Sequence, residues 1–237
     1  MPPIEHAPDL VINFNGPAPR LADFRLMVVD MDSTLINIEC VDEIADAAGL
    51  KEKVAAITEA TMQGVICDFK DSLRQRVALL RGIPLTHLER VYTERLRLNP
   101  GAQALVTAAH AAGLKTLLVS GGFTFFASRV KADLGIDLAR SNELEVKDGV
   151  LTGKLVDQCW GDICDGAEKR RTLLEVASLM GIAPAQAIAV GDGANDLPMM
   201  AVAGLSVAYH AKPKVRAQAN VAINAGGLDR LLELMTP

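Results

Sequence analysis

Residues 26–36 read LMVVDMDSTLI, and this stretch decides the fold. Its first four residues are all apolar, which is typical of a central strand that is covered on both faces. Asp30 and Asp32 follow directly where that strand is expected to end. Because carboxylates are rarely buried without a partner, this pair indicates a cation, a proton or a reaction. The alternative is that residues 32–34 only cap a following helix.

The composition narrows the class of protein. The chain has 237 residues, half of them hydrophobic, which is enough for one core and a smaller second unit. Its net charge is −5 and no basic run stands out, so we expect no nucleic-acid partner. The first ten residues lack the pattern of a secretory signal, and the uncharged runs are shorter than the ~20 residues of a membrane span. We therefore expect a soluble, cytoplasmic protein with no membrane partner, whose four cysteines are free thiols.

Short apolar runs alternate with helical patterns along most of the chain. After residues 26–29 they recur at 115–120, 187–192, 205–209 and 220–223. This alternation predicts an α/β fold with a doubly wound, Rossmann-like parallel sheet, whose ligands bind at the carboxyl ends of the strands.

Two segments interrupt this alternation, and they define the expected domains. Apolar residues recur only at helical spacing between Ile38 and Asn99, which predicts a helical cap domain inserted after the first strand. Asp148-Gly149 between alternating segments predicts a small β-hairpin. We therefore expect an α/β core at residues 25–37 and 100–237, a cap at 38–99, and a loosely held, proline-rich lead-in at 1–24.

Two further strands are expected to deliver polar groups to the edge of the sheet where Asp30 lies. Ser120-Gly-Gly122 offers a hydroxyl and exposed backbone N–H groups in a tight turn, which is typical of an anion cradle. The segment GDGANDL begins at Gly191 and adds two carboxylates and an amide. Taken singly, the first could be a plain glycine-rich turn and the second an Asx turn with a helix cap.

Together, these groups favour phosphoryl transfer. Four carboxylates in one crevice cannot all stay ionised without positive charge, and Mg²⁺ is the usual partner where a phosphate shares the site. A carboxylate aimed at both a cation and an anion cradle implies an aspartyl-phosphate intermediate. Lys169, at the start of the helix before the third strand, is the best candidate to neutralise the phosphate.

The chain resembles the haloacid dehalogenase superfamily of phosphohydrolases. The resemblance is carried by DMDSTL at 30–35, SGG at 120–122, Lys169 and GDGAND at 191–196. It extends from about Arg25 to the C-terminus. Through motifs in the cap, the chain is similar to members that hydrolyse O-phospho-L-serine in the last step of serine biosynthesis. The resemblance implies that Asp30 attacks phosphorus, and that Asp32 protonates the leaving oxygen and then activates water.

The same resemblance assigns the remaining roles. It implies a Mg²⁺ ion held by Asp30, Asp192 and the backbone carbonyl of Asp32, with Asp196 orienting Lys169 or the metal's waters. Residues implied to hold the phosphoryl oxygens, or to lie beside them, are Ser120, Gly121, Lys169 and Asn195. In the cap it implies Glu39 for a substrate ammonium, Arg76 for a substrate carboxylate, and Met62 and Phe69 as apolar residues that close over the substrate. Together, Glu39 and Arg76 would select an amino acid.

Two other functions share much of this pattern. A relative could pass the phosphoryl group to another amino-acid alcohol, such as homoserine, in place of water. A signalling receiver domain also combines a doubly wound sheet with an acidic cluster, a Ser or Thr and a Lys, but it needs no long cap. The roughly sixty helical residues after the first strand therefore favour the enzyme.

Overall fold

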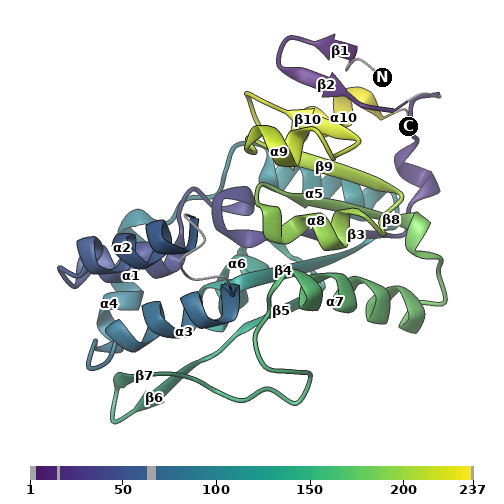
Figure 1. Cartoon of the computed structure of the whole chain (residues 1–237). Helices are drawn as coiled ribbons and strands as arrows, with labels where there is room; N and C mark the ends of the chain where they lie inside the picture. Colours follow the sequence, from purple (N-terminus) through teal and green to yellow (C-terminus); the bar gives the residue numbers. More distant parts are fainter. Residues whose placement is uncertain (1–3, 15–16, 63–67, 236–237) are drawn as a thin grey trace.

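A computed structural model describes residues 4–14, 17–62 and 68–235 of the chain. Its main sheet has the strand order β1-β2-β10-β9-β8-β3-β4-β5 (Figure 1). Six neighbouring strands run parallel, and five of them are the predicted apolar runs. Their bounds are β3 (Leu26–Val29), β4 (Lys115–Phe123), β5 (Leu138–Asn142), β8 (Ala187–Gly191), β9 (Leu205–Tyr209) and β10 (Val221–Ile223). The predicted α/β fold with a mostly parallel sheet is confirmed.

Helices cover both faces of this sheet. Leu26 and Val28 of β3 belong to the cluster that includes residues of α7 (Gly166–Leu179) and α8 (Leu197–Met200). Met27 and Val29 point to the other face, towards α5 (Ala102–Ala111) and α6 (Thr124–Leu134). In Figure 1, α7 and α8 lie in front of the sheet and α5 and α6 behind it. Alternate residues of β3 thus enter two different cores, which explains its continuous apolar run.

The predicted helical insert is present between β3 and β4. It contains α1 (Cys40–Ala47), α2 (Lys51–Met62), α3 (Phe69–Leu79), α4 (Leu85–Arg90) and the short helical segment η3 (Val91–Arg95). These helices lie to one side of the sheet in Figure 1. The predicted hairpin is also present as β6 (Leu144–Lys147) and β7 (Val150–Leu155).

The hairpin supports the insert. Asp148 and Gly149 both have positive φ angles, 53° and 77°, as a tight two-residue turn requires. Gly82 N donates to the Leu151 carbonyl at 2.7 Å, and Leu151 N donates to the Ile83 carbonyl at 2.9 Å. Since these bonds join β7 to the loop after α3, the core holds the insert over one end of the sheet.

The structure differs from the sequence-based expectation at both edges of the sheet. The lead-in was expected to be loosely held, but β1 (Ile4–Ala7) and β2 (Leu10–Ile12) form a hairpin, and β2 pairs with β10. Leu10 is fully buried, which anchors this hairpin. At the other edge, β5 was not predicted, because its sequence LARSN has too few apolar residues to mark a strand.

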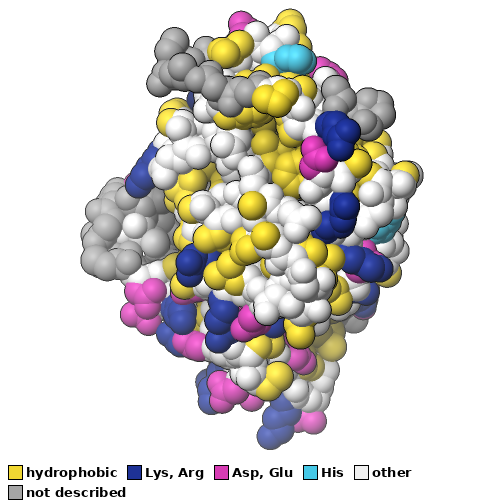
Figure 2. Space-filling model, turned by 90° about the vertical axis from the view of Figure 1, so that its right-hand side faces the viewer, with side chains coloured by type: hydrophobic (Ala, Val, Ile, Leu, Met, Phe, Trp, Pro, Cys, Tyr) yellow, Lys and Arg dark blue, Asp and Glu magenta, His cyan; other side chains and the backbone are white. Residues whose placement is uncertain are grey.

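The remaining short elements are η1 (Leu21–Asp23), η2 (Met31–Leu35), η4 (Pro184–Gln186), η5 (Ala194–Asp196), α9 (Pro213–Arg216), η6 (Leu228–Arg230) and α10 (Leu231–Leu234). On the face shown in Figure 2, basic and acidic side chains lie interspersed among hydrophobic ones. Within the described ranges, no helix is both long and apolar enough to cross a membrane. Cys40, Cys159 and Cys164 are free thiols, and Cys67 lies outside the described residues.

Candidate active site

The candidate site lies at the carboxyl end of β3, where the order of successive strands in the sheet reverses. β3 has β4 on one side and β8 on the other, so the carboxyl ends of three neighbouring parallel strands meet here. Such a switch point leaves a crevice in which ligands bind. Asp30 follows β3 directly, and one of its carboxylate oxygens accepts a hydrogen bond from Met31 N at 2.7 Å. Asp192 follows β8, and Asp196 ends η5 just beyond it.

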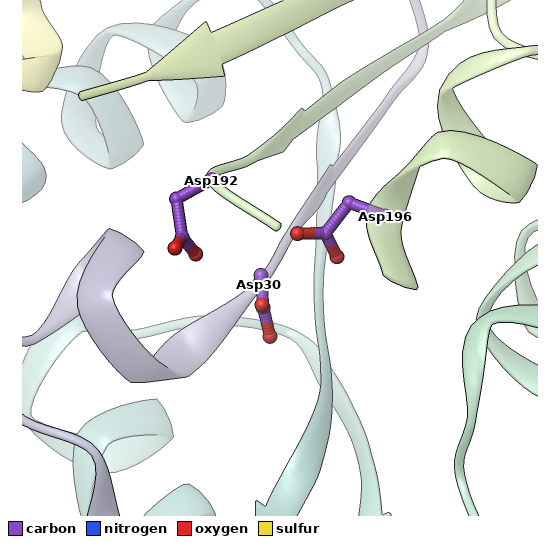
Figure 3. A group of neighbouring side chains, drawn as sticks. All are labelled: Asp30, Asp192 and Asp196. Carbon is purple, nitrogen blue, oxygen red and sulfur yellow. The ribbon is translucent and has the colours of Figure 1, made fainter. Parts of the chain in front are cut away.

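Three carboxylates come together at this point (Figure 3). Asp30, Asp192 and Asp196 each offer an oxygen within 4.8 Å of the others. Burial, and the charge of Asp196 next, raise the pKa of Asp30 well above its ordinary value and that of Asp192 to about 6. Such a cluster can ionise fully only if positive charge is added. This acidic group could therefore bind a metal ion, as the sequence predicted.

Lys169 supplies part of that positive charge from below. Its Nζ lies 2.7 Å from Asp30 Oδ1 and 2.7 Å from Asp196 Oδ1, and the side chain is fully buried in α7. Burial alone would lower the pKa of Lys169, but Asp196 and Asp30 outweigh it and raise the pKa. Lys169 is therefore held in its charged form, in contact with both Asp30 and Asp196.

The expected anion cradle has a different backbone from the predicted tight turn. Ser120, Gly121 and Gly122 lie within β4, and the pairing with β5 becomes irregular between Val119 and Phe123. Gly122 N donates to Ser120 Oγ at 2.8 Å, so the hydroxyl proton of Ser120 stays available for a ligand. A Cβ at Gly122 would lie only 2.9 Å from Met31 Cε. The backbone can pass this close to the site because Gly121 and Gly122 carry no side chains.

Asp32 is held by the first residue of α1. Its Oδ1 lies 3.0 Å from Cys40 Sγ, and its Oδ2 accepts a hydrogen bond from Cys40 N at 3.2 Å. Burial, together with the charge of Glu39, raises the pKa of Asp32 to about 7. A carboxyl group with this pKa can both give and take a proton near neutral pH.

A pocket of about 300 Å³ connects these groups with the helical insert. Among the predicted site residues, those that line it are Asp30, Asp32, Glu39, Phe69, Arg76, Ser120, Gly121, Asp192 and Asn195. Lys169 and Asp196 are fully buried beneath it. Met62 ends α2, but its side chain is outside what the structure describes. The fold therefore brings residues from α1, α3 and three strand ends to one cavity.

Arg76 and Glu39 are the charged residues that the insert contributes to the pocket. Arg76 Nε is buried and, among the described residues, has no hydrogen-bond partner. Burial lowers the pKa of Arg76, which means that its charge is incompletely compensated by Asp42, Glu39 and Asp32. Glu39 accepts a hydrogen bond from Ser33 Oγ at 2.6 Å. A buried guanidinium nitrogen that lacks a partner among the described residues favours an anionic ligand group.

Three supporting residues had no assigned role in the sequence analysis. Thr34 Oγ1 donates to Asp192 Oδ1 at 3.0 Å, across 158 positions of sequence. Asn142 Nδ2 donates to the Gly121 carbonyl at 2.8 Å, and its Oδ1 accepts from Cys164 N at 2.8 Å. Cys40 contacts Asp32 as described above. No local pattern marks these contacts: those of Thr34 and Asn142 join segments that are distant in sequence, and that of Cys40 depends on how the loop from Asp32 folds back.

The fold and the site together define a class of enzyme: an α/β phosphohydrolase with a carboxylate nucleophile beneath a helical insert. A sequence model of the haloacid dehalogenase-like hydrolase family matches residues 27–201, and the chain belongs to this family. The phosphoserine phosphatase of Polaromonas sp. is 67% identical over 235 residues, which cover 99% of this chain and 100% of that protein.

Solved structures agree with this assignment. Two structures of phosphoserine phosphatase, one with a phospho-aspartyl intermediate analogue and one with bound substrate, superpose on this chain with a TM-score of 0.81. Each is 37% identical to it, and the match covers 90% of this chain and 99% of the other. The fold is therefore shared over nearly the whole of both molecules.

Proposed function

We propose that this protein is a phosphoserine phosphatase, which hydrolyses O-phosphoserine to serine and phosphate through an aspartyl phosphate. Its relatives of that activity match the full length of the chain. The observation that carries the substrate assignment is Arg76, whose buried Nε has no partner in the described part of the chain and which lines the same pocket as Glu39. The reaction is the last step of serine biosynthesis.

Asp30 is the proposed nucleophile. One of its carboxylate oxygens forms a bond to phosphorus while the bond from phosphorus to the serine oxygen breaks. Asp32, with a pKa of about 7, gives its proton to that leaving oxygen. Lys169, 2.7 Å from Asp30 Oδ1, favours the ionised form of the nucleophile and offsets the charge of the phosphoryl oxygens. Ser120 Oγ and Gly121 N would donate to these oxygens.

In the second step, Asp32 acts as a base in place of an acid. After serine has left, Asp32 is a carboxylate and accepts a proton from the water that attacks the phosphorus of the aspartyl phosphate. The bond between phosphorus and Asp30 breaks, phosphate leaves and both carboxyl groups return to their starting state. One group can serve in both steps because its pKa lies near neutral pH.

The proposed cofactor is Mg²⁺. The donors available at this point are oxygens, including Asp30, Asp192 and the backbone carbonyl of Asp32, and oxygen ligands are those that Mg²⁺ prefers. The raised pKa values of Asp30 and Asp192 fit this assignment, because they reflect carboxylates that lack compensating charge. When bound, the ion supplies positive charge that lets these groups ionise and stabilises the phosphoryl oxygens.

The insert is proposed to select the amino acid. Arg76 would bind the substrate carboxylate with its planar guanidinium, and Glu39 would bind the ammonium. Phe69 lies beside the cradle, with its Cζ 3.1 Å from where a Cβ of Gly121 would be. This ring would cover the phosphoserine and exclude water from it. A second apolar contact was predicted for Met62.

Phosphate release from four compounds tests the proposal. With Mg²⁺, we expect release from O-phosphoserine and much less from O-phosphothreonine, phosphoethanolamine, which lacks the carboxylate, and 3-phosphoglycerate, which lacks the ammonium. Equal release from all four would contradict the roles of Glu39 and Arg76. Homoserine is added in a parallel reaction: phosphohomoserine formed at the expense of free phosphate would identify a phosphotransferase.

A further inference from the structure

The carboxylate of Asp32 is held on both oxygens by a single residue. Cys40 N donates to Oδ2 at 3.2 Å, and Cys40 Sγ lies 3.0 Å from Oδ1. When Asp32 is ionised, the thiol is the only group of this pair that can donate, so the bond runs from S–H to Oδ1. Cys40 has no solvent exposure, which means that water does not compete for the thiol.

The surrounding backbone leaves Asp32 little freedom. Asp32 Oδ2 would lie 3.0 Å from a Cβ at Gly122, so the anion cradle confines the carboxylate on the other side. The loop that joins Asp32 to Cys40 is closed by two more hydrogen bonds, Ser33 N to the Ile38 carbonyl at 3.2 Å and Ser33 Oγ to Glu39 at 2.6 Å. Cys40 is thus in a fixed position relative to the group that it contacts.

We infer that Cys40 is a positioning residue for the acid–base step, and that its thiol proton fixes the plane of the Asp32 carboxylate relative to the leaving serine oxygen. This inference rests on the proposed function. Proton transfer depends on the direction of the donor, and a small misplacement of a reacting group is costly in rate. The insert therefore contributes to the chemical step through the first residue of α1, in addition to binding the amino acid.

Variants of Cys40 separate the hydrogen bond from packing. Cys40→Ala and Cys40→Val both lack the donor, but the first leaves space and the second fills it. We expect both to lower kcat for phosphoserine by about tenfold or more with KM unchanged, because Glu39 and Arg76 still bind the substrate. Cys40→Ser keeps a donor and should recover most of kcat. Cys159→Ser, at an exposed thiol far from this contact in sequence, is the matched control and should match the wild type.

The kinetic pattern decides the inference. Wild-type kcat in either folded donorless variant would overturn it, and so would a serine variant as slow as the alanine variant, or a loss confined to KM. Thermal melting of each variant identifies those that are folded. If the wild-type protein itself releases no phosphate from phosphoserine, the proposed function fails instead, so the two failures are distinct.

Discussion

Replacing Lys169 by Met should destabilise the protein strongly, because it removes the cation between two buried carboxylates. Lys169 Nζ lies 2.7 Å from both Asp30 and Asp196, and none of its side chain reaches solvent. Loss of one partner from such a buried group costs about 3–5 kcal/mol in the free energy of unfolding. For a chain of this size, that corresponds to a fall in Tm of about 6–20 °C. Met keeps most of the side-chain volume, so the loss of stability would reflect the missing charge and not a packing defect.

The pH dependence gives a second test of the same reasoning. Without Lys169, the native state takes up still more protons relative to the unfolded state, because the pKa of Asp30, which burial already raises, rises further when the neighbouring cation is lost. Stability of the variant should therefore fall as the pH rises, and its deficit should be larger at pH 8 than at pH 5.

Urea unfolding in EDTA, for wild type and variant at both pH values, measures this deficit. Lys147→Met, on the exposed hairpin, is the matched control and should behave as wild type. Adding Asp196→Asn to Lys169→Met should recover part of the loss, since one of the two uncompensated charges is removed. A Lys169→Met protein as stable as wild type at pH 8 would refute this account of Lys169 as the cation that compensates Asp30 and Asp196.

Three further predictions concern the nucleophile, the substrate and the metal. Asp30→Asn should abolish phosphate release while circular dichroism shows an intact fold; retained hydrolysis would exclude Asp30 as the nucleophile. Arg76→Lys should lower kcat/KM for phosphoserine about 10–100-fold, because the bidentate fork is lost, and leave phosphoethanolamine unaffected, with exposed Arg74→Lys on the same helix as control. An equal loss on both substrates would contradict carboxylate binding. Burial raises the pKa of Asp192 to about 6, so the native metal-free protein binds extra protons and should lose stability as pH rises from about 4 to 7. Mg²⁺ should therefore raise Tm more at pH 7 than at pH 5, and an equal shift at both would contradict the carboxylate site.

Local patterns were sufficient for most of the fold. The continuous apolar run of β3 predicted a strand buried on both faces, and Leu26 and Met27 do enter opposite cores. Asp148-Gly149 predicted the hairpin that the structure contains. The strands at both edges of the main sheet were predicted less well. An edge strand needs little apolar surface, so β5 and the hairpin of β1 and β2 have short or polar sequences that do not stand out as strands.

The sequence by itself determined which groups reach the candidate site. Asp30 and Asp192 each follow an apolar strand, Ser120 follows the apolar run within β4, and parallel strands present their carboxyl ends at one edge. Only the tertiary structure decided how those groups are supported, as by Cys40 on Asp32 and by Thr34 on Asp192. Strand periodicity is set by neighbouring residues and can be read locally. A hydrogen bond between side chains far apart in the chain depends on strand register, helix position and rotamer, which are fixed only when the whole chain packs.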